Sequence, residues 1–293
     1  MSKSVVIING CDAKFYPFMM QSLKSLLALH LDERADIAIL DLGLTPAQVS
    51  ELQGMGFTVK QPYWTLEVPE KFRGKHQIGL VARTALREFF PGYKTYLWFD
   101  ADAWAQTPEF FDSLVAAANA TGAGVIRENG ANYKRDFAYS KWWFGNMMAA
   151  YGLIPGFRIA LKPAINIGIL CLSDTAPHWE SWINYYKQFI AKRERVNNQH
   201  SFNAAIELDH LPYTEVPARC NWITTLSTPG WDPVARMVTE PQRGGKPLSV
   251  LHLAGPDKER NYALIQPDGK IMNTQLTFTA ISALQDEQIH KSA

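Results

Sequence analysis

Short apolar runs alternate with helically spaced apolar residues along the first hundred positions. Residues 5–8 and 37–40 are continuous apolar runs, typical of strands buried on both faces of a sheet. After the second run, Thr45-Pro46 matches the cap-then-proline start of a helix. The pattern predicts strands over 5–8, 37–40, 57–59 and 96–99. It predicts helices over 18–30 and 78–90, another helix that begins at residue 46, and a long loop over 61–77.

The second half of the chain is less regular. We expect helices over 110–119, 140–151, 179–192, 198–208 and 277–290, and strands over 124–126, 164–172 and 248–253. Alternating strands and helices predict the α/β class, with a mostly parallel, doubly wound sheet and helices on both faces. We expect an irregular C-terminal part.

Composition, net charge and cysteine spacing limit the classes of protein and the cellular setting to which this chain could belong. Apolar residues make up 47% of the chain, enough for a large core, and a net charge of +1 gives no support for a nucleic-acid partner. Cys11, Cys171 and Cys220 lack zinc or redox spacing, so we expect a reducing, cytoplasmic setting. No stretch reaches the ~20 apolar residues of a spanning helix. Peripheral membrane contact through 141–144 or 192–195 stays open, as does a homodimer.

Two carboxylates follow the apolar strand at 96–99. Asp100 and Asp102 are two residues apart, so in an extended segment their side chains point the same way and could hold one hard cation. The carboxyl edge of such a sheet is where ligands bind. The alternative is that Asp102 caps the helix near Pro108, and the Asp-x-Asp pattern alone leaves both open.

A third metal ligand is available far along the chain. His252 lies near the end of the predicted strand at 248–253, and Lys258 lies six residues beyond His252. Imidazole with carboxylates suits Mn²⁺ better than Ca²⁺, and a lysine beside the metal could balance a diphosphate. The alternative for His252 is an ordinary structural histidine. The Gly-x-Gly-x-x-Gly and Walker motifs are absent, which excludes the dinucleotide and P-loop classes.

Five short motifs in order, over residues 5–258, resemble glycosyltransferase family 8. These are retaining GT-A enzymes that use UDP-sugars and Mn²⁺. The motifs are Asn9-Gly10-Cys11-Asp12 with Tyr16, Asp100-Ala101-Asp102 preceded by Arg83, Asn166-Ile167-Gly168, Asn198-Gln199 with Asn203, and His252 with Gly255 and Lys258.

The resemblance implies a role for each matching position. Asp100, Asp102 and His252 would hold Mn²⁺ or Mg²⁺, with Asp100 also facing the donor. The nucleotide would be bound by Asp12, Tyr16, Gly255 and Lys258. Arg83, Asn166 and Gln199 would contact the donor sugar and act in catalysis, with Gln199 near the reacting carbon.

The resemblance also implies a domain plan and an activity. Residues 1–258 would form one GT-A nucleotide-sugar-binding catalytic domain, and 259–293 an extension with a packed helix and a polar tail. The enzyme would move a hexose from a UDP-sugar, with retention, to a glycan, lipid-linked or protein acceptor.

The chain departs from the family pattern at several positions. Asn198 stands where the family has an acid, Ile167 where it usually has Ser, and Glu259-Arg260 where it often has Pro-Trp. A non-catalytic nucleotide-sugar or glycan-binding protein of the same fold is the alternative. A haloacid-dehalogenase-type phosphohydrolase fits poorly, because its acidic pair follows the first strand.

Overall fold

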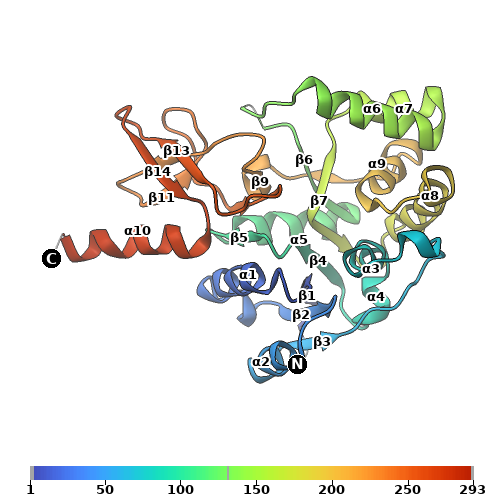
Figure 1. Ribbon diagram of the computed structural model, residues 1–293, viewed down its shortest axis with the longest axis horizontal. Helices are drawn as coiled ribbons and strands as arrows, with labels where there is room; N and C mark the ends of the chain where they lie inside the picture. The colour runs from blue at the N-terminus through green and yellow to red at the C-terminus, as the bar shows by residue number, and fades with distance from the viewer. Residues whose placement is uncertain (1–2, 131, 292–293) are drawn as a thin grey trace.

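A seven-stranded sheet forms the centre of the computed structural model, which describes residues 3–130 and 132–291 (Figure 1). Only β7 runs antiparallel to its neighbours, and the other pairs in this sheet are parallel. The predicted mostly parallel α/β sheet is therefore confirmed. The strand order is β3 (Thr58–Lys60), β2 (Asp36–Asp41), β1 (Val5–Cys11), β4 (Thr95–Phe99), β7 (Ile165–Ser173), β6 (Ala123–Arg127) and β8 (Thr214–Glu215).

Helices cover both faces of this sheet, as the pattern predicts. Alternate residues of β1 belong to different cores: Ile7 packs in one apolar cluster and Ile8 in the other. The first cluster includes residues of α1 (Tyr16–Ala28) and α5 (Glu109–Thr121), and the second includes residues of α4 (Leu86–Phe89), α8 (His178–Arg193) and α9 (Asn198–Leu208). A continuous apolar run is the expected sequence of a strand buried in this way.

Several helix boundaries differ from the prediction. The stretch expected to be one helix over 78–90 consists of α3 (Lys75–Ala82), a 3-10 turn at Arg83–Ala85 and α4, and another 3-10 turn, Glu70–Phe72, lies in the predicted loop. The capping alternative for Asp102 is wrong, because the residue before α5 is Pro108 and no side chain caps that helix. The helix after β2, α2 (Pro46–Gly54), begins with the expected Thr45 cap.

The region between β6 and β7 holds a helical pair. α6 (Phe137–Tyr151) starts three residues before the predicted 140, because the Asp136 carboxylate accepts a bond from the Tyr139 amide. Gly152, at φ +91°, ends α6 and leads directly into α7 (Leu153–Ala160), which the sequence pattern did not predict. The two helices pack along each other at one edge of the molecule (Figure 1).

The C-terminal part adds two small sheets and a closing helix. One sheet joins β5 (Ala103–Ala105), β12 (Val250–His252) and β9 (Trp222–Ile223), and the other joins β11 (Met237–Thr239), β10 (Gly230–Asp232), β13 (Asn261–Ile265) and β14 (Ile271–Gln275). The β13–β14 hairpin was not predicted. The closing helix, α10 (Phe278–Lys291), corresponds to the predicted helix over 277–290.

The predicted domain boundary at residue 258 falls in the loop between β12 and β13. Tyr262, Leu264 and Leu276, beyond it, pack in one cluster with Trp104 and Trp222. The boundary stays a prediction, and the last two residues of the expected polar tail lie outside the described residues. Within the described ranges, no helix is both long enough and apolar enough to cross a membrane.

Candidate metal and donor site

The two carboxylates lie at the end of β4, as predicted. The Asp100 amide donates to the Gly168 carbonyl of β7 at 2.8 Å, and the Ala103 amide donates back to the Asp100 carbonyl at 3.0 Å. This turn after β4 places both side chains at the edge of the sheet. The Asp100 carboxylate also accepts a bond from the Trp98 indole at 2.7 Å and pairs with the Arg83 guanidinium, which lies over the Trp98 ring.

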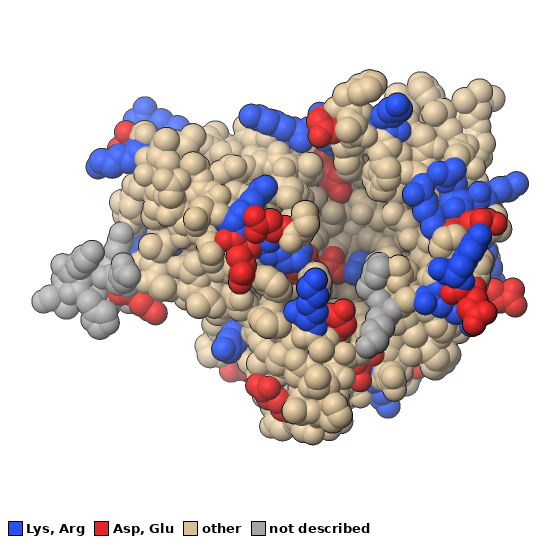
Figure 2. Space-filling model, in the orientation of Figure 1, with Lys and Arg blue, Asp and Glu red and all other residues tan. Residues whose placement is uncertain are grey.

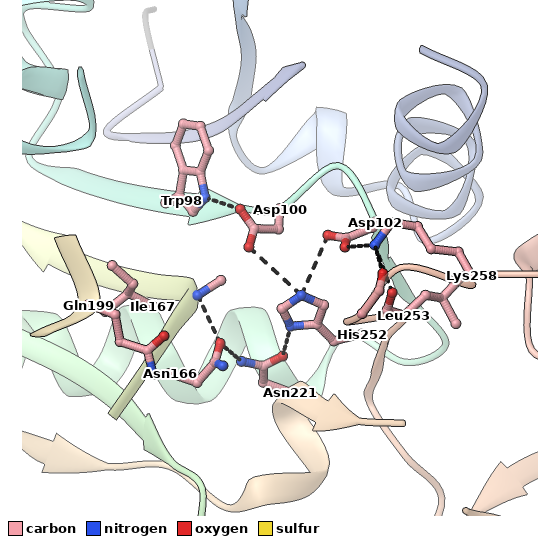
Figure 3. A network of polar contacts seen from close by, with 12 residues as sticks. Trp98, Asp100, Asp102, Asn166, Ile167, Gln199, Asn221, His252, Leu253 and Lys258 are labelled. Atoms are coloured by element: carbon pink, nitrogen blue, oxygen red, sulfur yellow. Dashed lines mark hydrogen bonds and ion pairs between the residues drawn. The ribbon is translucent and has the colours of Figure 1, made fainter. Parts of the chain in front are cut away.

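His252 is brought to the same place by the pairing of β12 with β5. The pairing is antiparallel and sets His252 opposite Ala103, the residue that follows Asp102. The His252 Nε2 atom is 3.5 Å from Asp102 Oδ1 and 3.8 Å from Asp100 Oδ2 (Figure 3). One ligand atom from each of the three residues lies within 4.8 Å of the others.

A chain of hydrogen bonds determines which nitrogen of His252 faces the carboxylates. Glu128 is a carboxylate acceptor, so Asn166 must donate to it through Nδ2, at 3.1 Å. The Asn166 oxygen then accepts from Asn221 Nδ2 at 3.0 Å, which leaves the Asn221 oxygen 3.0 Å from His252 Nδ1 (Figure 3). The neutral form of His252 therefore carries its proton on Nδ1 and directs the Nε2 lone pair at the acidic pair, as metal-binding histidines do.

The three side chains fit a divalent cation. In an octahedral shell with bonds of about 2.1 Å, neighbouring ligand atoms lie roughly 3 Å apart and opposite ones about 4.2 Å apart. The observed separations from Nε2 fall within that range. Gly168 makes room for the cluster, since a Cβ there would lie 2.4 Å from His252 Cε1 and 2.6 Å from Asp100 Oδ2.

Charge in the cluster is strongly coupled. Burial raises the pKa of Asp100, and the adjacent Arg83 only partly offsets this. Burial also disfavours the charged form of Asp102, but His252 and Lys258 outweigh it and lower the pKa of that carboxyl below its usual range. For His252, the Asp102 and Asp100 carboxylates outweigh burial and raise its pKa. These directions describe a site whose negative charge a cation would stabilise.

Lys258 is a buried cation beside this cluster. Its Nζ atom donates to Asp102 Oδ2 at 2.5 Å and to the carbonyls of Leu253 and Gly255 at 2.9 and 3.1 Å (Figure 3). Gly255 has φ +99°, a conformation that favours glycine, and this turn brings Lys258 back over Asp102. The predicted Lys258 and Gly255 thus lie beside the predicted metal ligands.

A cleft opens in front of the acidic pair. Its described lining residues include Gly10, Asp12, Phe15, Arg83 and Trp98 as well as both carboxylates. Figure 2 shows the molecule hollowed on this face, with acidic and basic atoms at the floor. The N-terminal motif, the helix arginine and the acidic pair, far apart in sequence, meet here.

The two residues predicted to contact the base differ in position. Asp12 lines the cleft, and its Oδ1 accepts bonds from the Lys14 and Phe15 amides at 3.0 and 3.1 Å. Tyr16 begins α1, and its hydroxyl donates to Glu51 at 2.8 Å, on the side of α2. Among the described residues it is Phe15, not Tyr16, that lines the cleft.

Glu128 and Asn221 are site residues that the sequence analysis missed. Glu128 is buried directly after β6, and its carboxylate accepts from Asn166 Nδ2, from Gln199 Nε2 at 3.2 Å and from the Tyr139 hydroxyl at 2.6 Å. It joins two of the predicted catalytic residues. An acid at the end of a buried strand was the available signal, the same one that identified Asp100.

Two further positions of the family-like motif serve the packing of α9. Asn203 brackets the start of β7, accepting from the Ile165 amide at 2.7 Å and donating to the Ile165 carbonyl at 3.0 Å. Asn198, which stands where the family has an acid, is buried and donates to the Leu80 carbonyl at 3.0 Å. Both hold Gln199 in place between β7 and α3.

Comparison with known proteins gives matches at the level of structure. No family model and no curated protein matches the sequence. The fold is similar to the galactosyltransferase LgtC in complex with donor and acceptor sugar analogues, with TM-score 0.53 and 18% identity over 86% of this chain and 87% of LgtC.

Two other glycosyltransferase structures are also similar. Mouse xyloside xylosyltransferase 1 matches with TM-score 0.53 and 12% identity over 86% of this chain and 97% of that one. The bifunctional WbbM matches with TM-score 0.57 and 11% identity over 88% of this chain and 47% of that one. At these identities the likeness concerns the fold, and the chain has the fold of the GT-A glycosyltransferases.

Proposed function

We propose that this protein is a metal-dependent glycosyltransferase that transfers a hexose from a UDP-sugar to an acceptor with retention of configuration. The observation that carries the proposal is the Asp100–Asp102–His252 cluster with the buried Lys258 beside it, whose two carboxylates line a cleft. The fold, shared with glycosyltransferases, supports the same reaction class.

Asp100, Asp102 and His252 would hold the metal, which we propose to be Mn²⁺, with Mg²⁺ as a substitute. When bound, the cation would supply Lewis-acid stabilisation of the diphosphate leaving group. The hydrogen bond from His252 Nδ1 to Asn221 keeps the ring in the ligating tautomer.

The chain itself adds positive charge around the leaving group. Lys258 is buried and pairs with Asp102, so it would place a positive charge beside a diphosphate held at the metal. A fixed cation in a site of low dielectric stabilises growing negative charge more than a hydrated one does. Arg83 holds Asp100 in place from the opposite side, along the wall of the cleft.

Asn166 and Gln199 would face the donor sugar. Each uses its amide NH₂ group on Glu128, so the carbonyl oxygen of Gln199 is turned away from Glu128. That oxygen would accept from a sugar hydroxyl. We keep Asp12 as a contact to the base, and we propose Phe15 together with Tyr16 as the aromatic candidates for stacking.

A glycan, a lipid-linked sugar or a protein side chain would be the acceptor, and no nucleic acid is expected. The three buried, unpaired cysteines support the proposal of a cytoplasmic setting. The domain plan proposed with this function keeps residues 1–258 as the catalytic unit.

Release of UDP tests the function. The protein is incubated with a panel of UDP-sugars and Mn²⁺, and UDP is measured with and without chelator. Asp102→Asn is expected to lower release at least a hundredfold. The matched control is Asp268→Asn, in the β13–β14 turn, where the carboxylate pairs only with Lys270 among the described residues.

Two outcomes would contradict the enzyme. Release that is equal in Asp102→Asn and wild type would remove the metal site from the reaction. Tight UDP binding with no release or transfer from any donor would identify a nucleotide-sugar-binding protein of the same fold.

A further inference from the structure

Exposed apolar side chains concentrate on the α6–α7 pair. Of eleven large apolar side chains exposed among the described residues, six lie in this short segment. A concentration of this kind on a folded surface marks an interaction site. The six are Phe137 (82% exposed), Trp142 (44%), Leu153 (72%), Ile154 (79%), Phe157 (48%) and Leu161 (62%).

The geometry of α7 gathers four of them on one outward strip. At ~100° per residue, positions 153, 154, 157 and 161 fall within an arc of about 100°. Ile159 lies opposite this arc, Gly156 and Ala160 lie between the two, and all three are buried. The outward strip is therefore an unpartnered face of a well-packed helix.

This apolar face is held rigidly. A Cβ on Gly156 would lie 2.5 Å from the backbone of Met147, so the glycine lets α7 approach α6 closely. The rings of Phe144 and Phe157 lie edge to face at 5.8 Å, which ties the strip to α6. The exposed side chains thus sit on a stable platform rather than on a loose loop.

Basic residues lie beside the strip. Residues 132–162 contain five basic and one acidic residue in a chain of net charge +1. Arg158 follows the apolar arc on α7, at about 140° on the same helical wheel. Lys162 lies two residues after the end of the helix, with its Nζ atom 3.8 Å from Glu207 Oε2. Arg193 and Arg195, from the end of α8 and the loop after it, both donate to the Asn146 side chain on α6 and add positive charge at this edge.

We propose that the α6–α7 surface docks on the interface of an anionic lipid membrane. A bilayer offers an apolar layer for the strip and anionic headgroups for the basic rim at the same time. A second copy related by a twofold axis would set this basic segment against itself, which like-charge repulsion opposes. The upper edge in Figure 2 is uncharged over much of its area, with basic and a few acidic atoms beside it.

The position of this surface also names an acceptor class. Tyr139 of α6 donates to Glu128, and Glu128 accepts from Gln199 in the proposed active site. A docked membrane would therefore lie on the side of the site that holds Gln199, which we propose to lie near the reacting carbon, and this suits a lipid-linked acceptor. This part of the inference rests on the proposed transferase function.

Vesicle co-sedimentation of the full chain tests the docking. Phosphatidylcholine vesicles are compared with vesicles in which about one third of the lipid is phosphatidylglycerol. The combined change Leu153→Ser, Ile154→Ser and Phe157→Ser is expected to weaken binding to the anionic vesicles roughly a hundredfold. Its matched control makes the same change at Val234, in the β10–β11 turn, and at Ile265 and Ile271, on β13 and β14, which are also exposed.

A second pair of variants tests the charge. Arg158→Gln with Lys162→Gln is expected to weaken binding about fivefold per residue, whereas Lys60→Gln with Lys270→Gln leaves it unchanged. Added salt is expected to weaken wild-type binding in the same direction.

Failure of docking and failure of the enzyme are separable. Wild-type binding by the α7 triple variant, or no vesicle binding by wild type, would overturn the docking. A dimer in sedimentation velocity that the triple variant abolishes, without vesicle binding, would assign the surface to a second copy. UDP release is measured separately on the same variants. If the wild-type protein releases no UDP, the proposal of a lipid-linked acceptor is contradicted, while the proposal of membrane docking is unaffected.

Discussion

Asn221 shows how much of a metal site lies outside its ligands. No motif in the sequence singled it out, yet its carboxamide decides that His252 presents Nε2 to the acidic pair. Its own orientation is set in turn by Asn166 and the buried Glu128. The donor and acceptor of each hydrogen bond in this series follow from one fact: the Glu128 carboxylate can only accept hydrogen bonds.

Asn221→Ala is therefore expected to weaken Mn²⁺ binding about 10- to 100-fold, because His252 loses the partner that holds its tautomer and ring orientation. Isothermal titration with Mn²⁺ measures the change. Asn261→Ala, on the exposed side of β13, is the control and should bind Mn²⁺ as the wild type does. Equal affinity in both variants would mean that Asn221 does not support a metal ligand.

Gly168 gives a second residue-scale prediction. Gly168→Ala is expected to lower Mn²⁺ affinity at least tenfold and to cost about 1–3 kcal/mol in free energy of unfolding, because the new Cβ overlaps His252 and Asp100. Gly145→Ala, in the middle of α6 with open space at its Cβ, is expected to stabilise by about 1 kcal/mol. Denaturant unfolding and metal titration of both variants check this, and unchanged Mn²⁺ affinity in Gly168→Ala would count against the cluster.

At the scale of elements, the local sequence pattern predicted which strands and helices exist better than it predicted strand pairing and element boundaries. The apolar run at 164–172 predicted β7, but its antiparallel direction depends on where the chain arrives after the α6–α7 pair. The missed helix α7 contains Pro155 and Gly156, which local propensity disfavours. Packing against α6 outweighs that propensity, and this packing cannot be predicted from a short stretch of sequence.

The packing of α6, α8 and α9 predicts an effect of pH. His200 on α9 lies against the rings of Trp142, Trp143 and Phe189, at centroid distances of 4.8, 4.9 and 5.2 Å. Burial, with a smaller contribution from Arg195 and Arg193, lowers the pKa of His200 to about 3. In the unfolded chain the His200 side chain is therefore protonated below about pH 6.5. In the folded protein it is protonated only below about pH 3.

Stability from this group is fully present above pH 6.5 and is lost as the pH falls toward 3. By pH 5 the loss is about 2 kcal/mol. His200→Phe, which keeps a ring among the aromatic residues, is expected to flatten this part of the stability curve. Urea unfolding of both proteins between pH 7 and about pH 5 measures it. Parallel curves for the two proteins would mean that His200 does not titrate on unfolding.

At the scale of the whole molecule, the C-terminal strands complete the core beside the site. Trp104, two residues after Asp102, donates its indole N–H to the Leu276 carbonyl at 2.7 Å. Leu264 of β13 is fully buried in the same apolar cluster. The segment beyond residue 258 is thus packed against the turn that carries the carboxylates.

Leu264→Ala is accordingly expected to cost about 2–5 kcal/mol, because it removes a buried side chain and leaves a cavity. Ile265→Ala, its half-exposed neighbour, is expected to change stability by about 0.5 kcal/mol or less. Thermal unfolding followed by calorimetry measures both. If Leu264→Ala destabilises only a separate unfolding transition of the C-terminal strands and leaves the main transition unchanged, the two parts do not share a core.

The sequence by itself determined the fold class, the acidic pair and the residues available to complete its site. Apolar runs, helical spacings and turn residues are local, and a carboxylate at a strand end is visible in a few positions. His252 and Lys258 could be proposed as partners because they too follow an apolar strand.

Only the tertiary structure decided how these residues meet. The β5–β12 pairing sets His252 beside Asp102 across about 150 residues, and Gly168 leaves the space between them. Glu128 and Asn221 entered the site, and Phe15 rather than Tyr16 faced the cleft, because side-chain direction depends on long-range pairing. The apolar face of α7 was likewise undetectable in sequence, since burial and exposure are properties of the packed molecule.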